Sequence, residues 1–128
     1  MTFEYRTTVK GYELDSYNHV NNAVYLNYIE QARWEILREL DLFEYLFKND
    51  LFLVVIEINI KFLREARLFD ELCIKTDLIG EKPYLIFLQK IYNVKTNLKI
   101  THARVKSLLI NKGKIPVDLP EKILNKIK

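Results

Sequence analysis

The chain has 128 residues, of which 49% are hydrophobic and 29% are charged. This length and balance are typical of one folded globular domain, and they exclude a mainly disordered chain. The 20 basic and 17 acidic residues leave a formal charge of +3, an excess too small to indicate a nucleic-acid-binding protein. We therefore expect residues 1–128 to form one domain.

Cysteine and histidine content excludes further classes of site. The only cysteine, Cys73, excludes an internal disulfide and a cysteine-based zinc site. With only His19 and His102, we expect no metal site. No apolar run reaches the roughly 20 residues that span a bilayer, and Met1–Lys10 contains no apolar signal core. We expect a cytoplasmic protein with a reduced thiol.

The first third of the chain predicts a strand, a loop and a long helix. Apolar and polar residues alternate over Phe3–Val9, which predicts a strand, and polar residues dominate Gly11–Asn22, which predicts a loop. A helix is predicted from about Ala23 to Leu40, with Asn21 or Asn22 as its N-cap. Its apolar positions recur at helical spacing, namely Leu26, Ile29, Ala32 or Arg33, Ile36, Leu37 and Leu40.

The remaining two thirds are predicted to be mostly strands. After a short helix over Asp41–Lys48, strict alternation over Val54–Phe62 predicts a strand with one dry and one polar face. Further elements are three strands (Glu71–Leu78, Tyr84–Val94 and Lys99–Ile110), three turns (Gly80–Pro83, Val94–Leu98 and Lys112–Lys114) and a last helix from Pro120 to Lys128.

This order of elements predicts an α+β fold. Short turns between consecutive strands make the sheet antiparallel, and the long helix must cover one of its faces. One helix covers a sheet of about five long strands incompletely. We therefore expect the chain to associate with a second copy, through a sheet edge or a face.

The loop before the long helix carries the residues best suited to chemistry. Asp15, His19, Asn21 and Asn22 lie within eight residues and end at a helix N-terminus, whose free N–H groups favour developing negative charge. A carboxylate there can act as a base or a nucleophile, and an amide can donate to a carbonyl. The same residue types also suit a turn and a helix cap, so both interpretations stand at this point.

The spacing of these residues resembles a known family. The pattern Asp15-x-x-x-His19-Val20-Asn21-Asn22-x-x-Tyr25-x-x-Tyr28-x-Glu30-x-x-Arg33 resembles acyl-CoA thioesterases of the 4-hydroxybenzoyl-CoA thioesterase type, which have the hotdog fold. It is also similar to the first half of plant acyl-carrier-protein (ACP) thioesterases. The resemblance continues through Arg64–Arg67, Asp70–Leu72, Ala103–Val105 and Ile115–Glu121.

Several positions depart from the family pattern. Asn18 stands where relatives often have glycine, and asparagine tolerates positive φ better than most residues. Glu65 and Phe69 replace a proline and a glycine in the turn before Asp70. Phe52 stands near a family glycine whose N–H approaches the thioester, which implies a narrower pocket.

The resemblance implies a hotdog fold, with a long central helix wrapped by the sheet, and sites at a subunit interface. The expected reaction is hydrolysis of acyl-CoA to a free acid and CoA, with no other cofactor. The expected assembly is a homodimer or a homotetramer (a dimer of dimers). Asp15 is expected to be the general base or nucleophile. Asn21 or Asn22 would polarise the carbonyl, and His19 would position the loop or transfer a proton.

The resemblance also implies how substrate is held. Tyr25 and Phe52 are expected to line the acyl pocket. Cations are expected to bind the phosphates of CoA, with Arg64, Arg67, Lys82 and Lys90 as candidates. Glu30 and Arg33 are expected to be a structural pair or to anchor a loop.

Three other functions remain open. The substrate could be carried by an acidic ACP, which would need a basic patch on the thioesterase. The chain could bind acyl-CoA without turnover, since a fold does not determine a function. A hotdog dehydratase is a third alternative, although the motif is that of a thioesterase.

Overall fold

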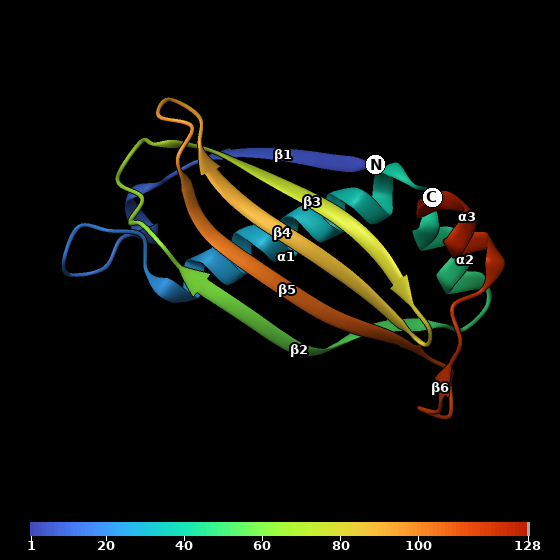
Figure 1. Ribbon diagram of the computed structural model, residues 1–128. Helices are drawn as coiled ribbons and strands as arrows, with labels where there is room; N and C mark the ends of the chain where they lie inside the picture. The colour runs from blue at the N-terminus through green and yellow to red at the C-terminus, as the bar shows by residue number, and fades with distance from the viewer. Residues whose placement is uncertain (128) are drawn as a thin grey trace.

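An antiparallel sheet curves around one long helix in the computed structural model, which describes residues 1–127 (Figure 1). The helix is α1 (Asn22–Glu39), and it crosses the concave face of the sheet. Five long strands lie in the order β1-β3-β4-β5-β2, and the short β6 pairs with β5. The strand bounds are β1 Thr2–Thr8, β2 Phe52–Phe62, β3 Glu71–Glu81, β4 Tyr84–Asn93, β5 Lys99–Ile110 and β6 Pro116–Val117.

Two short helices lie at one end of the sheet. α2 (Leu42–Lys48) follows α1 directly, and α3 (Glu121–Ile127) packs near it (Figure 1). The α+β class and the predicted helices and strands are therefore confirmed, with ends that differ by at most three residues. The predicted last helix ends at Ile127, and Lys128 lies outside the described residues.

Two predictions about the strands need correction. The sheet has a sixth strand, because the chain folds back after the Lys112–Lys114 turn and pairs Val117 with Leu109. Gly80 is not part of the predicted turn, because it lies inside β3 and pairs with Leu85 of β4. A Cβ at Gly80 would lie 2.8 Å from Cδ2 of Leu124 in α3, so a larger residue here would require the Leu124 side chain to shift.

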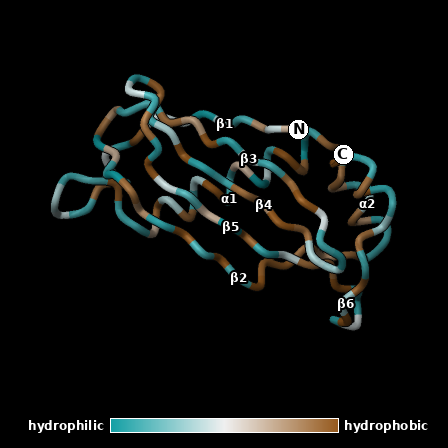
Figure 2. Tube along the Cα trace, in the orientation of Figure 1, coloured by the Kyte–Doolittle hydropathy of each residue, from teal (hydrophilic) through white to brown (hydrophobic). Residues whose placement is uncertain are grey.

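The core lies between α1 and the concave face of the sheet. The residues of β3, β4 and β5 that face α1 are mostly apolar and buried, among them Ile74, Phe87 and Val105. Figure 2 shows hydrophobic and hydrophilic residues interspersed along these strands. The buried face of α1 consists of Tyr25, Tyr28, Ile29, Ala32, Arg33 and Ile36. Leu26, which the helical spacing placed on that face, is instead 36% exposed, because the two tyrosines turn the buried stripe away from it.

β2 forms a free edge of the sheet, because it pairs with β5 on one side only. This edge keeps large apolar side chains partly exposed, among them Val55, Ile56, Ile58 and Phe62. Such a long, apolar strand edge is a surface on which another strand can pair. Within residues 1–127, no helix is long and apolar enough to cross a membrane.

Candidate functional site

The Asp15 side chain closes a tight turn before α1. Its Oδ1 accepts the backbone N–H of Tyr17 at 2.9 Å and that of His19 at 3.2 Å. The backbones of Asp15 and His19 also bond to each other at 2.8 Å, and Asn18 adopts a φ of 62°, as expected of an asparagine at this position. We call residues 15–19 the Asp15 turn. Two N–H groups orient the carboxylate and leave Oδ2 free to meet a water or a substrate.

The start of α1 lies directly after this turn. Asn21 is the N-cap, and its side-chain oxygen accepts the N–H of Ala23 at 2.9 Å. The amide NH₂ of Asn21 is not used by this bond, so it can donate to another group. Asn22 is the first helical residue and is exposed. The arrangement places a carboxylate, amide donors and the partial positive charge of a helix N-terminus side by side.

Buried hydrogen bonds anchor the Asp15 turn to the body of the protein. Tyr28 donates its O–H to Glu13 at 2.8 Å, and the same carboxylate accepts the N–H of Lys10 at 2.7 Å. Burial and the neighbouring Glu13 raise the pKa of Tyr28 far above its usual value, so Tyr28 stays protonated and remains a donor. On the other side, Val20 donates its N–H to the carbonyl of Ala66 at 2.9 Å.

Replacing Glu13 with alanine is expected to destabilise the protein by about 1–3 kcal/mol, because the buried hydroxyl of Tyr28 loses its acceptor. The free energy of unfolding, measured by urea titration, checks this. The double change Glu13→Ala with Tyr28→Phe removes donor and acceptor together. It should recover part of the loss, and a double variant no more stable than Glu13→Ala would contradict this account.

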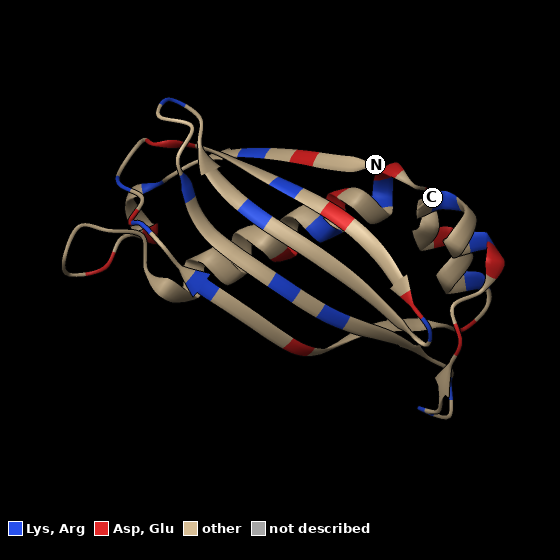
Figure 3. Cartoon of the chain, in the orientation of Figure 1, with Lys and Arg blue, Asp and Glu red and all other residues tan. Residues whose placement is uncertain are grey.

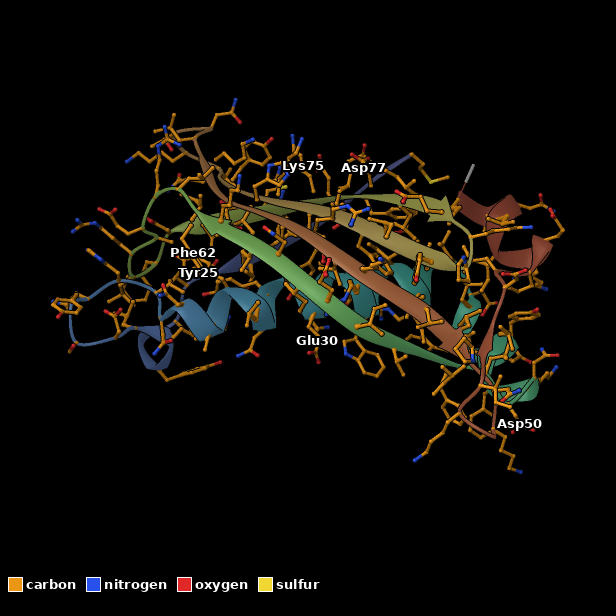
Figure 4. All side chains as sticks on the ribbon, turned by 60° about the horizontal axis from the view of Figure 1, so that its bottom comes forward. Tyr25, Glu30, Asp50, Phe62, Lys75 and Asp77 are labelled. Carbon is orange, nitrogen blue, oxygen red and sulfur yellow. The ribbon has the colours of Figure 1, made fainter. Side chains whose placement is uncertain are left out.

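Tyr25 links α1 to the segment after β2. Its side chain is 2% exposed, and its hydroxyl oxygen accepts the N–H of Ala66 at 3.0 Å. Burial raises the pKa of Tyr25, although the bond from Ala66 opposes the rise. The ring also contacts Phe62, with centroids 5.6 Å apart (Figure 4). In the single chain, Tyr25 thus packs in the core.

An apolar groove of about 500 Å³ opens between α1, α2 and the first half of β2. Its walls include Trp34, Leu37, Phe43, Leu53, Val55 and Phe87, and we call it the α1–β2 groove. Trp34 and Phe43 stack with ring centroids 5.2 Å apart and join the two helices. Phe52, predicted to contact substrate, lies on the rim and is 53% exposed. A groove with this lining suits an apolar group such as an acyl chain.

A largely buried cation, Arg33, also lines the groove. Arg33 is 9% exposed and donates to Oε1 of Gln89 at 2.9 Å. Burial lowers the pKa of Arg33, and Glu30 partly counteracts this. Within residues 1–127 the expected Glu30–Arg33 pair does not form, because Arg33 bonds to Gln89 and the exposed Glu30 instead accepts a hydrogen bond from Trp34 Nε1 at 3.5 Å.

The structure gathers some of the predicted residues and separates others. Asp15, His19, Asn21 and Asn22 lie together at the start of α1. The nearby Arg64 donates to the carbonyl of Lys99 at 2.8 Å. Phe52 lies at the other end of β2, and Lys82 lies in the β3–β4 turn, also at that end (Figure 1).

Three features of this region were not predicted from the sequence. These are the α1–β2 groove, the bond from Arg33 to Gln89, and the anchor between Tyr28 and Glu13. One signal was available, because Gln89 interrupts the apolar alternation between Phe87 and Ile91 on an inward-facing strand position. The groove itself depends on how α2 packs against α1 and β2, and no local sequence pattern predicts that packing.

Comparisons with known proteins agree with this fold. The family model described as the thioesterase-like superfamily matches residues 9–127. The crystal structure of the probable thioesterase YbaW from Escherichia coli superposes with a TM-score of 0.88 and 32% identity over 98% of both chains.

Two curated proteins are also similar to this chain. Long-chain acyl-CoA thioesterase FadM from Escherichia coli is 46% identical over 70 residues, which are 55% of this chain and 53% of that protein. Acyl-acyl carrier protein thioesterase ATL3 from Arabidopsis thaliana is 28% identical over 96% of this chain and 66% of that protein. The matched segments therefore span about half and about two thirds of these relatives.

Proposed function

Because this chain belongs to the thioesterase-like superfamily and has its hotdog fold, we propose that it hydrolyses acyl-CoA thioesters to a free acid and CoA. The observation that supports this most directly is the Asp15 turn. Two backbone N–H groups hold Oδ1 of Asp15, its Oδ2 is free, and the amide of Asn21 and the N-terminus of α1 lie beside it.

Two routes use the same residues. In the first, Oδ2 of Asp15 takes a proton from water while the water oxygen attacks the thioester carbon. The C–S bond then breaks, and the thiolate of CoA receives the proton. In the second, Oδ2 attacks the carbon itself, CoA leaves, and water hydrolyses the resulting anhydride. In both, the amide of Asn21 or Asn22 and the N–H groups at the helix start stabilise negative charge on the carbonyl oxygen.

We also propose that two copies complete one site. The Asp15 turn lies near the end of β2, at Phe62, whereas the α1–β2 groove lies near its beginning, at Phe52. Figure 4 shows this separation, with Tyr25 and Phe62 at one end of the molecule and Asp50, which lines the groove, at the other. Antiparallel pairing of β2 with a second β2 would bring the Asp15 turn of one copy to the groove of its partner.

The groove would then hold the acyl chain of the substrate. Its apolar walls exclude water from the chain, and Phe52 on the rim would contact the atoms next to the thioester. FadM is named a long-chain acyl-CoA thioesterase, which supports a long aliphatic chain as the first substrate to test.

The test is thiol release from a panel of acyl-CoA esters that includes short, long and aromatic acyl groups. We expect turnover of at least one ester, with the highest kcat/KM for chains long enough to fill the groove. Heat-denatured protein serves as the blank. Binding of acyl-CoA without any thiol release would instead establish a non-catalytic binding protein.

An acyl-ACP thioesterase is the second candidate, and one observation favours it. The match to ATL3 covers nearly the whole chain, and that protein is named for a carrier-protein substrate. The chemistry at Asp15 would be the same, and only the carrier of the acyl group would differ.

A further inference from the structure

Arg33 brings a charged group into the wall of a mostly apolar groove. Its side chain is 9% exposed, yet it lines the α1–β2 groove together with Leu53, Val55 and Phe87. The guanidinium carbon lies 6.0 Å from the ring centroid of Phe87 on β4. Figure 3 shows basic and acidic segments in the middle of α1, where the helix passes beneath the sheet. The groove therefore offers hydrogen-bond donors as well as apolar surface.

Hydrogen bonds inside the protein use only part of this guanidinium. Arg33 Nη1 donates to Oε1 of Gln89 at 2.9 Å; within residues 1–127 this is its one hydrogen bond, and no carboxylate lies within 4.0 Å of it. The orientation of Gln89 is fixed, because its amide nitrogen donates to the carbonyl of Ile29 at 2.9 Å and to the hydroxyl of Thr76 at 3.2 Å. A guanidinium carries five N–H groups, so most of them can donate to a molecule in the groove.

An acyl chain in the groove would change the surroundings of these N–H groups. Water that enters the groove can accept their hydrogen bonds, whereas an acyl chain displaces that water. A chain made only of CH₂ groups offers no acceptor, and a donor left without a partner costs free energy, more so when it is charged. A chain with an oxygen beside Arg33 supplies the acceptor. The groove should therefore favour an oxygen-bearing chain over a plain chain of the same length.

The charges around Arg33 favour a neutral oxygen over a carboxylate. Glu30 and Asp50 also line the groove, and both would repel an anionic group there. Burial lowers the pKa of Arg33, and the charge of Glu30 opposes this, so the two side chains interact electrostatically. A hydroxyl is neutral, and it can accept a hydrogen bond from a guanidinium while it donates one to a carboxylate.

The depth of Arg33 in the groove determines where along the chain this hydroxyl must lie. Phe52 is 53% exposed on the rim, and the proposed site places the atoms next to the thioester beside it. Arg33 lies deeper, on the side of α1 that faces Phe87. A hydroxyl that meets Arg33 must therefore lie beyond the carbons next to the thioester.

We propose that Arg33 selects aliphatic acyl thioesters that carry a hydroxyl group in the body of the chain, beyond the carbons next to the thioester. This inference rests on the proposed thioester hydrolysis and on the acyl chain lying in the α1–β2 groove. It adds the substrate class and the residue that recognises it. Arg33 acts here in binding, and the bonds are broken at Asp15.

The test compares hexadecanoyl-CoA with a series of hydroxyhexadecanoyl-CoA esters that differ only in the carbon that carries the hydroxyl. In wild type, we expect at least one ester hydroxylated in the middle of the chain to exceed hexadecanoyl-CoA in kcat/KM by about 10-fold or more. The ester hydroxylated at the third carbon should show no such gain, because its hydroxyl stays near the rim. A series in which no hydroxylated ester exceeds hexadecanoyl-CoA would overturn the inference.

Arg33→Met removes the donors and keeps a side chain of similar length. The kcat/KM for the preferred hydroxylated ester should fall about 10-fold or more, while that for hexadecanoyl-CoA stays within about threefold or rises. A purely structural role of Arg33 would lower both values alike, so the ratio of the two is the measurement. Arg33→Met with Gln89→Met serves where the single variant fails to fold, because it removes donor and acceptor together. It should lose the same preference.

Arg38→Met is the matched control. Arg38 lies on the same helix, but it is exposed and pairs with Glu35 outside the groove. This variant should keep the wild-type preference for the hydroxylated ester.

The outcomes separate this inference from the proposed function. Equal turnover of plain and hydroxylated esters, or a preference that survives in Arg33→Met, would overturn the inference and leave the hydrolase proposal intact. A higher kcat/KM for the CoA ester of a chain that ends in a carboxylate would overturn the choice of a neutral group. If no ester is hydrolysed, the proposed function falls, and the Kd values of the free acids decide the inference. Tighter binding of the hydroxylated acid that is lost in Arg33→Met would support recognition by Arg33, and equal binding would overturn it.

Discussion

Asp15→Asn is expected to lower kcat/KM for acyl-thioester hydrolysis by about 10²–10⁴-fold. The asparagine Oδ1 can still accept the N–H groups of Tyr17 and His19, so the Asp15 turn should keep its shape. The amide, however, can neither take a proton from water nor attack the thioester carbon. The loss should therefore appear in kcat, with the Kd for substrate nearly unchanged.

A second carboxylate provides the control for this prediction. Asp77 lies on the convex face of β3 and accepts a hydrogen bond from Thr2 at 2.6 Å, far from the start of α1 (Figure 4). Asp77→Asn should keep wild-type turnover. Comparison with Asp15→Ala separates structure from chemistry, because alanine removes the acceptor of the turn and should also lower the Tm. Wild-type turnover by Asp15→Asn would exclude Asp15 from the reaction.

Local signals predicted the turn and the helix cap before α1 well. Asn21 was expected as a possible cap because its side chain accepts N–H groups that a helix leaves free, and it bonds to Ala23. Asn18 was expected to tolerate a positive φ, and its φ is 62°. Such features depend on residues only a few positions apart, so the sequence contains all of their causes.

The helix faces and the groove depend on tertiary packing, which no local pattern contains. Leu26 fits the helical repeat as well as Tyr25 does, yet only Tyr25 is buried, because its hydroxyl meets Ala66 of a distant segment. Arg33 occupies an apolar position of the same repeat, and its partner Gln89 lies 56 residues away. The α1–β2 groove likewise forms only where α2 turns back against β2.

The sequence predicted an exposed part of the sheet only in general terms, because one helix could not cover all of it. It did not indicate that β2 would be a free edge. The structure identifies which side chains this edge exposes. Ile58 points to the same face as Ile60 and is 38% exposed, although it lies in the middle of an apolar strand. The proposed pairing of two β2 strands would bury the remaining surface of Ile58 in both copies.

Ile58→Asp is therefore expected to separate the proposed dimer and to lower thioester turnover with it. The change removes apolar burial and places a charge in the interface, and two-fold symmetry makes each effect act twice. Together these effects should weaken association by at least about 100-fold. Sedimentation velocity over a range of protein concentrations measures the change.

Ile79→Asp is the matched control, because Ile79 is 39% exposed but lies on β3, away from the β2 edge. It should leave the mass of the assembly and the turnover unchanged. Turnover should follow the dimer fraction of Ile58→Asp as protein concentration rises, because each site needs the Asp15 turn of one copy and the groove of its partner. A monomeric Ile58→Asp variant with full activity would show that one chain holds a complete site. The acyl chain would then have to bind elsewhere than in the α1–β2 groove, which lies at the far end of β2 from Asp15 of the same chain.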